Sequence, residues 1–143
     1  MFSTIILAAA KAVGVPGALL LAICTHESGL RNVEAPHDHG SPSYGLCQVK
    51  EDTAKILGYT GDGHGLMNPE TTAKYASLYL KYQLDRYQGD WLMATSAYNA
   101  GSYSESTRHP GYPKNIKYIN KIRKLLPEDY KLLLNVVAIY AEK

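Results

Sequence analysis

The sequence predicts an all-α fold, or at most an α+β fold in which a minimal hairpin accompanies the helices. Apolar residues recur at helical spacing in several segments, as on the stripe of Ala73, Ala76 and Leu80. Glycine, proline, asparagine and aspartate stand at the ends of these segments, where helices start and stop. No segment of any length alternates apolar and polar residues as a half-buried strand does. We therefore expect a helical domain.

The N-terminal segment is strongly apolar, and we interpret it as two core helices. The first is predicted over Ile5–Val13, and the second begins near Pro16 and runs to about His26. A signal peptide or membrane span is the alternative, but the start carries no positive side chain, and Lys11 and Pro16 interrupt the apolar run. We expect no export signal and no stable membrane insertion.

The middle of the chain is rich in turn-forming residues. Residues 31–44 are predicted to form a loop or a small hairpin. A short helix is expected over Lys50–Leu57, with Gly58 as its stop. Residues 61–65 contain three glycines but lack the Lys-Ser/Thr ending of a phosphate loop, so we expect a plain loop there.

The second half of the chain predicts four further helices. The first has Asn68 as its cap and Pro69 at its first position, and the next is capped by Asp90. The four segments are expected over residues 68–87, 91–99, 116–126 and 132–140.

Length and composition describe an ordinary globular chain. The 143 residues are enough for one domain with a real core, and we expect a single domain over residues 1–143. Apolar residues make up 45% of the chain and charged residues 20%, which indicates neither disorder nor a coiled coil. The formal charge is +2, and the Lys and Arg residues look dispersed rather than gathered in a stripe. Nucleic-acid binding is therefore not supported, and we expect a monomer.

Cys24 and Cys47 do not make a disulfide scaffold, and we expect two buried free thiols. A disulfide between them is the alternative. The run His37-Asp38-His39 is too sparse for a zinc site, so no metal and no cofactor is expected.

Glu27 is the first candidate for chemistry. It follows the apolar run Ala18–Cys24, so its carboxyl should be pressed against hydrophobic neighbours. Desolvation disfavours the charged form, which would raise the pKa of Glu27 and keep it a proton donor near neutral pH. The alternative is an ordinary glutamate on a solvated helix end.

Four motifs occur in order: Glu27-Ser28, residues 45–48 (Gly-Leu-Cys-Gln), residues 97–101 (Ala-Tyr-Asn-Ala-Gly) and Tyr118. This order resembles the soluble lytic transglycosylase (SLT) family of lysozyme-like enzymes, and a small phage-type catalytic domain most closely. The resemblance covers about residues 5–126. It implies a lysozyme-like helical domain with a substrate cleft, in which peptidoglycan glycan strands are bound and cleaved.

The resemblance implies that Glu27 is the single catalytic residue. It would protonate the oxygen between N-acetylmuramic acid and N-acetylglucosamine, and then act as base on the C6 hydroxyl to close a 1,6-anhydro ring. Cys47 stands where the family most often has Met, which leaves a smaller side chain in that wall.

The resemblance also implies substrate-binding residues. Gln48 would hydrogen-bond in the cleft, and Ser28 would help to hold the acetyl group or the acid. Tyr98 and Asn99 match the Ala-Tyr-Asn motif, in which the asparagine binds the substrate acetamide. Tyr118 matches a tyrosine whose hydroxyl approaches the catalytic glutamate.

Asp38 leaves a second reading of the chemistry open. Goose-type lysozymes place water-activating aspartates in the corresponding loop, so Asp38 as a second carboxylate would make the chain an inverting muramidase. The alternative is a loop aspartate that forms an Asx turn. Glu34, Glu51 and Asp52 are weaker candidates, interpreted as loop and first-turn charge.

A third reading, from another class, is a non-catalytic wall-binding or assembly protein, against which an intact Glu27 argues. For the biological setting we expect action on the cell wall, periplasmic or extracellular. The interpretation is a phage enzyme, delivered with the virion or released through a holin. A domain taken from a longer protein is the alternative, and wall-remodelling proteins of secretion systems use the same domain but normally carry an export signal.

Overall fold

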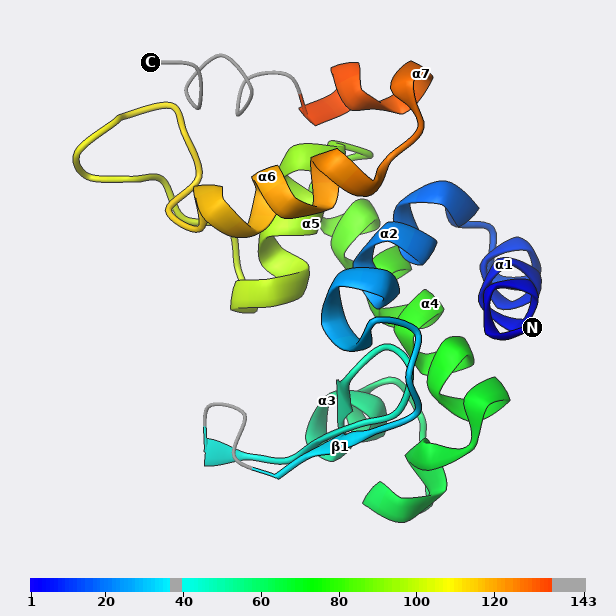
Figure 1. Cartoon of the computed structure of the whole chain (residues 1–143). Helices are drawn as coiled ribbons and strands as arrows, with labels where there is room; N and C mark the ends of the chain where they lie inside the picture. The colour runs from blue at the N-terminus through cyan, green and yellow to red at the C-terminus, as the bar shows by residue number, and fades with distance from the viewer. Residues whose placement is uncertain (37–39, 135–143) are drawn as a thin grey trace. The chain divides into compact units, whose positions relative to one another are not determined.

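The computed structural model describes residues 1–36 and 40–134, and the chain packs as two compact units, Met1–Lys81 and Tyr82–Lys143. The expectation of one domain stays a prediction, and each unit is described by itself. Helices dominate both units, and the elements are α1 (Phe2–Val13), α2 (Gly17–Ser28), β1 (Glu34–Ala35), β2 (Ser43–Tyr44), β3 (Val49–Lys50), α3 (Glu51–Ile56), η2 (Gly63–Met67), α4 (Pro69–Arg86), α5 (Trp91–Ala100), α6 (Ile116–Leu125), α7 (Glu128–Lys131) and η3 (Leu132–Leu134) (Figure 1).

The two N-terminal helices form the core of the first unit, as the sequence predicts. α1 packs beside α2 (Figure 1) and ends at Gly14, whose left-handed backbone lets its N–H donate to the Ala10 carbonyl at 2.8 Å. Pro16 is the cap residue just before α2, where a missing N–H costs nothing. The largest side chains of this core are fully buried: Ile6, Leu19, Leu20 and Ile23.

The predicted hairpin is present and has a third strand. β1, β2 and β3 form an antiparallel sheet in that order, with Glu34 opposite Tyr44 and Ser43 opposite Lys50. Each strand has only two residues, which is too short for an alternating pattern to appear in the sequence.

The prediction of two free thiols is wrong, because Cys24 and Cys47 form a disulfide. Their Cα atoms lie 4.3 Å apart, and both side chains are fully buried. The contact joins α2 to the chain just before β3, across 23 residues of sequence. Spacing alone does not indicate this approach, since it depends on how the sheet folds back onto the helix.

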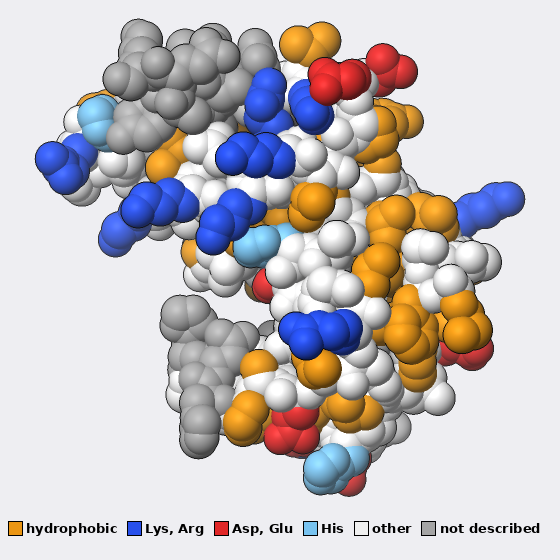
Figure 2. All heavy atoms as spheres, in the orientation of Figure 1, with side chains coloured by type: hydrophobic (Ala, Val, Ile, Leu, Met, Phe, Trp, Pro, Cys, Tyr) orange, Lys and Arg blue, Asp and Glu red, His pale blue; other side chains and the backbone are white. Residues whose placement is uncertain are grey.

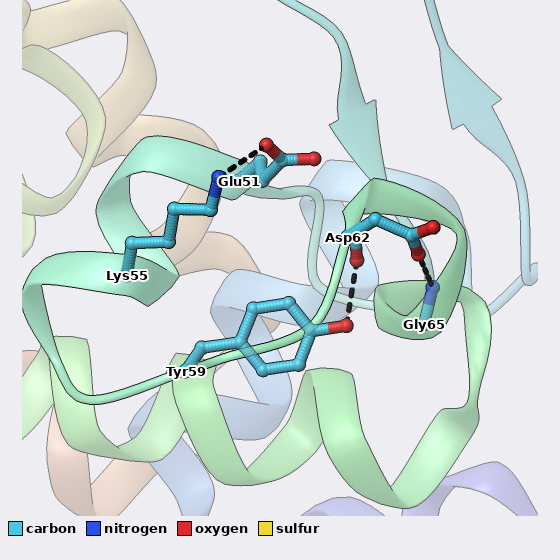
Figure 3. Close-up of polar contacts among 5 residues, drawn as sticks. All are labelled: Glu51, Lys55, Tyr59, Asp62 and Gly65. Carbon is cyan, nitrogen blue, oxygen red and sulfur yellow. Dashed lines mark hydrogen bonds and ion pairs between the residues drawn. The ribbon is translucent and has the colours of Figure 1, made fainter.

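The glycine-rich segment forms the short helix η2 rather than the plain loop that we expected. Asp62 caps it by accepting a hydrogen bond from the Gly65 N–H at 3.0 Å, and the Tyr59 hydroxyl donates to the Asp62 carbonyl at 2.6 Å (Figure 3). Asp62 thereby anchors both sides of the turn that leads into η2.

In the second unit α5 packs against α6, on which Ile119 and Ile122 are fully buried. The predicted cap of α5 is confirmed, because Asp90 accepts a hydrogen bond from the Met93 N–H at 3.0 Å. α7 was not predicted, and its Tyr130 ring stacks on Trp91 with ring centroids 5.6 Å apart.

The helix predicted over residues 132–140 is described only at its start, where residues 132–134 are a 3-10 turn, and its remainder lies outside the described residues. Over residues 1–36 and 40–134, the structure contains no helix with both the length and the apolar character that crossing a bilayer requires.

Candidate active site

Glu27 lies in the last turn of α2, where the helix leaves the core of the first unit. Its side chain is half-buried, whereas Cys24 and Ser28 on the same helix are buried. Gly29 ends the helix in a left-handed conformation, with its N–H donating to the Thr25 carbonyl at 2.8 Å. Glu27 thus follows a buried turn of α2 and is itself half-buried. That its carboxyl is pressed against hydrophobic neighbours stays a prediction.

Ser28 connects this helix end to the Gly-Leu-Cys-Gln motif. Its hydroxyl donates to the Leu46 carbonyl at 2.6 Å and lies 3.2 Å from the Cys24 carbonyl. The same oxygen accepts a hydrogen bond from the Arg31 N–H at 3.3 Å. Ser28, the neighbour of Glu27, therefore holds the end of α2 against the motif. A contact of Ser28 with the substrate stays a prediction.

The motif folds as a tight turn that requires glycine at its first position. Gly45 has φ +80°, and a Cβ there would lie 2.6 Å from the Leu66 carbonyl oxygen and 3.0 Å from the Thr72 side chain. Its N–H donates to the Val33 carbonyl at 2.8 Å. The backbone of this turn is thus packed directly against its surroundings, which leaves no room for a side chain.

Gln48 closes the turn in a left-handed conformation, with φ 52°. Its side-chain amide nitrogen donates to the Val33 carbonyl at 2.8 Å and to the Gly45 carbonyl at 2.9 Å. These bonds compensate a backbone conformation that is unfavourable for a residue with a side chain. Gln48 therefore has a structural role in the turn, and its predicted substrate contact is a further role that stays a prediction.

Two further expectations for the first unit concern a second carboxylate and a metal site. Asp38 lies outside the described residues, and the hydrolase reading stays a prediction. No group of three or more His, Cys, Asp or Glu among the described residues is arranged to hold a metal ion.

Glu51 has the character of a structural charge. It accepts a hydrogen bond from Lys55 at 2.8 Å one helical turn away, and this bond is the main cause that lowers the pKa of Glu51 (Figure 3). A carboxyl with a lowered pKa is ionised at neutral pH and cannot serve as a proton donor there. This agrees with its interpretation as first-turn charge.

In the second unit Tyr98 and Asn99 occupy the last turn of α5. Tyr98 is buried and Asn99 is exposed. The Asn99 side-chain oxygen accepts a hydrogen bond from the Asn115 amide at 3.0 Å. Asn115 also donates to the Ser96 carbonyl at 3.0 Å and accepts from the Ser96 hydroxyl at 2.5 Å. Asn115 thus fixes the orientation of Asn99.

Asn115 was not a candidate in the sequence, although its place just before a predicted helix was a signal for a cap. The amide of Asn115 instead borders a pocket of about 280 Å³ within the second unit. The residues that line it are Ser96, Ala100, Ser102, Ser104, Lys114 and Asn115. Such a lining suits a polyhydroxylated ligand.

The end of α5 is fixed by two residues that sequence reasoning missed. Gln83 is fully buried, and its amide nitrogen donates to the Gly101 carbonyl at 3.3 Å. Arg86 donates to the same carbonyl at 2.9 Å and to the Ser102 hydroxyl at 2.9 Å. A polar residue on the buried side of a helical pattern was the available signal, since such a group needs a partner.

Tyr118 lies on α6 and is buried at 8% exposure, next to the buried Ile119 in the sequence. Its predicted effect on the catalytic glutamate stays a prediction.

The Lys and Arg residues are less dispersed than the sequence suggests. Residues 106–127 contain no Asp or Glu, and Lys117, Lys121 and Lys124 are exposed at spacings of four and three residues, which places them on one face of α6. Exposed Lys114 precedes the helix and extends this lysine stripe (Lys114, Lys117, Lys121 and Lys124). Figure 2 shows blue side chains gathered over the region that α6 occupies in Figure 1.

The fold is similar to that of solved lytic transglycosylases. An inactive mutant of the lytic transglycosylase Slt from Pseudomonas aeruginosa matches with a TM-score of 0.60 at 19% identity, covering 96% of this chain and 23% of that chain. The 70-kDa soluble lytic transglycosylase in complex with bulgecin A gives a TM-score of 0.60 at 16% identity, over 94% of this chain and 22% of that chain. The 70-kDa soluble lytic transglycosylase from Escherichia coli gives a TM-score of 0.55 at 19% identity, over 90% of this chain and 22% of that chain.

These likenesses confirm the predicted fold class. The chain spans only 22% to 23% of the length of these proteins. The sequence itself matches the family model of the transglycosylase SLT domain over residues 4–119, which include all four motifs. The chain therefore belongs to the transglycosylase SLT domain family.

Proposed function

We propose that this chain is a peptidoglycan lytic transglycosylase that cleaves the MurNAc-β-1,4-GlcNAc bond and forms 1,6-anhydroMurNAc. The observation that carries the proposal is the position of Glu27. It ends a buried helix of an SLT-family chain, next to Ser28, which is hydrogen-bonded to the Gly-Leu-Cys-Gln turn.

In the first step Glu27 donates its proton to the oxygen that bridges the two sugars, and the glycosidic bond breaks. The half-buried setting of Glu27 supports this role, because partial desolvation disfavours the carboxylate and favours the protonated acid. The positive charge that develops at the muramic C1 is stabilised by the substrate's own acetamido group, so a second carboxylate is not required.

In the second step the Glu27 carboxylate takes the proton of the C6 hydroxyl on the same muramic ring. The C6 oxygen attacks C1, and the 1,6-anhydro bond closes without water. Glu27 ends the cycle protonated, as it began. One residue therefore serves as acid and then as base, which is the use that the family resemblance implies for it.

Groups of the second unit support the binding of a polar glycan. Asn99 is exposed and oriented by Asn115, so its amide is available in one defined orientation. We propose that Asn99 binds the substrate acetamide, with Tyr98 and Tyr118 as further contacts. The pocket beside Asn115 is lined by serine, asparagine and lysine residues, whose side chains are of a kind that can hydrogen-bond sugar hydroxyls.

Mass spectrometry of muropeptides released from purified peptidoglycan, with and without borohydride reduction, tests the proposal. We expect products one water lighter than reducing muropeptides, which resist reduction because the anhydro end has no free aldehyde. Reducible muramic ends would reject the transglycosylase and favour the muramidase alternative. No released product would favour a non-catalytic wall-binding protein.

The Asp38→Asn variant distinguishes transglycosylation from hydrolysis by a change in the protein rather than by analysis of the products. Under the transglycosylase proposal Asp38 activates no water, so the variant should retain most of the activity. A near-complete loss of cleavage, with an unchanged melting temperature, would instead identify Asp38 as the base of a hydrolase. The rate of muropeptide release and the circular dichroism melt measure both quantities.

The biological setting is a separate hypothesis. We propose an endolysin-type or virion-borne phage enzyme that reaches the wall by injection or through a holin. Co-expression with and without a holin in a bacterial host tests the first of these, for which holin-dependent lysis is the expected result.

A further inference from the structure

A covalent bond joins the helix that carries Glu27 to the turn that carries Gln48. Cys24 precedes Glu27 by about one turn of α2, and Cys47 is the residue just before Gln48. The hydrogen bond from Ser28 to the Leu46 carbonyl, at 2.6 Å, lies beside the disulfide. The two ends of the proposed active site in the first unit are therefore connected twice, once covalently and once by a hydrogen bond.

The turn is a segment that needs such support. Gly45 and Gln48 both have positive φ, at +80° and 52°, and Gln48 carries a side chain in that conformation. A left-handed conformation of this kind persists only where the surroundings enforce it. The side chain of Gln48 is itself part of this enforcement, since it donates to the Val33 and Gly45 carbonyls. A shift of the turn would therefore move the Gln48 side chain as well as its backbone.

The disulfide also lies in a closely packed interior, where a movement of either sulfur atom displaces its neighbours. Both half-cystines are fully buried, and so is Leu46, the residue before Cys47. Two thiols need more room than one S–S bond, because unbonded sulfur atoms lie at van der Waals distance. Breaking the bond in this packed interior would push α2 and the turn apart.

We propose that the Cys24–Cys47 disulfide is a positioning element of the active site, so that full activity requires an oxidising environment. The inference rests on the proposed function of Glu27. Reduction of the disulfide would let the helix end and the turn separate, and Glu27 would lose its fixed place relative to Gln48. Rate falls steeply with such misplacement, even when the fold survives.

The redox step itself is a simple exchange. A dithiol such as dithiothreitol gives two electrons and two protons to the disulfide, which becomes two thiols, while the dithiol closes to its cyclic disulfide. Oxidised glutathione reverses the step and is itself reduced to two thiols. A chain in a thiol-reducing compartment would thus be weakly active, and would reach full activity in an oxidising one.

The test compares the full chain in its oxidised form with two variants that cannot form the bond. Cys24→Ser/Cys47→Ser is nearly isosteric, and Cys24→Ala/Cys47→Met keeps the site apolar and restores side-chain volume. Ile6→Ala is the matched control, because Ile6 is equally buried in the same unit but lies on α1, a helix that carries neither cysteine. All assays are run well below the melting temperature of the least stable form.

We expect kcat for release of soluble muropeptides to fall about tenfold or more in both double variants, while KM changes little. Reduced wild type should behave as the variants do, and oxidised glutathione should restore it. Ile6→Ala should lose stability but keep its kcat. Hydrogen exchange should be faster for the amides of residues 45–48 in the double variants only, which reports positioning without any activity assay.

Double variants that are folded and keep the kcat of oxidised wild type would overturn the inference. An equal loss of kcat in Ile6→Ala would also overturn it, because the disulfide would then act through stability alone. If oxidised wild type releases no anhydro product, the proposed function fails instead, and the exchange data still decide whether the disulfide positions the turn.

Discussion

At the scale of single residues, Glu27 is the position on which the proposed chemistry depends. Glu27→Gln keeps the size and shape of the side chain but replaces the proton-donating carboxyl by an amide. We expect cleavage to fall by at least about 100-fold, the range attributed to one general acid. The melting temperature should be nearly unchanged, since the side chain is only half-buried. Release of muropeptides and a thermal melt measure the two effects, and substantial remaining activity would place the acid elsewhere.

Ser28 gives a second prediction at this scale. Ser28→Ala removes the donor to the Leu46 carbonyl, 2.6 Å away, and leaves that buried oxygen without this bond. We expect a loss of about 1–3 kcal/mol in the free energy of unfolding, measured by urea denaturation. Activity should fall as well, because the residue positions the turn.

The matched control is Ser77→Ala. Ser77 is equally buried, but its hydroxyl donates to the Ala73 carbonyl four residues earlier in α4, at 2.7 Å. That carbonyl belongs to a helix, so the change should cost less stability and leave activity intact. Equal losses in both variants would show that the Ser28 bond has no special role.

The candidate residues of the site differ in how far the sequence could predict them. Glu27 and Asn99 were predicted from short motifs, each of which is a contiguous stretch of the sequence. Asn115 and the Cys24–Cys47 bond depend on segments that meet only after folding. In the sequence Asn115 looks like an ordinary helix cap, so its hydrogen bond to Asn99 was not predicted. The spacing of Cys24 and Cys47 does not distinguish a disulfide from two free thiols, so their state was predicted wrongly.

At the scale of elements, the long helices were predictable because each carries its own cap and apolar stripe. Asn68 accepts hydrogen bonds from the N–H groups of residues 70 and 71, each at 3.0 Å, and this local chemistry sets the start of α4. The short elements η2 and α7 have no such repeat, since they contain five and four residues. Their form follows from side-chain contacts such as that between Tyr59 and Asp62.

The Gly-Leu-Cys-Gln turn carries the prediction at this scale. Gly45→Ala adds a Cβ at 2.6 Å from the Leu66 carbonyl oxygen, on a backbone with φ +80°. We expect a loss of more than about 2 kcal/mol in the free energy of unfolding, because backbone strain and overlap add. Gly14→Ala is the control, with φ +90° and nothing within 4 Å, so it isolates the strain. It should cost only about 1 kcal/mol. Equal costs in urea denaturation would contradict the overlap.

At the scale of the whole molecule, composition and charge were the weakest guides. The formal charge of +2 suggested a surface with little excess of positive charge. Residues 106–127 nevertheless contain no acidic side chain. The reason is that net charge sums over the chain, whereas a ligand meets one face. The family match, by contrast, extends over residues 4–119 and so was visible from motifs in both compact units.

The lysine stripe of α6 leads to a prediction about wall binding. Peptidoglycan peptides carry carboxylates, so exposed lysines on one face should attract the polymer and raise the local concentration of enzyme. Lys121→Glu should weaken binding to purified peptidoglycan in a sedimentation assay, and the salt dependence of binding should become shallower, because salt screens the attraction that the variant removes. Lys11→Glu changes the net charge equally but lies exposed on α1. It should bind as wild type does. If both variants lose the same affinity, net charge rather than the stripe determines binding, and the gathering of lysines on α6 has no part in it.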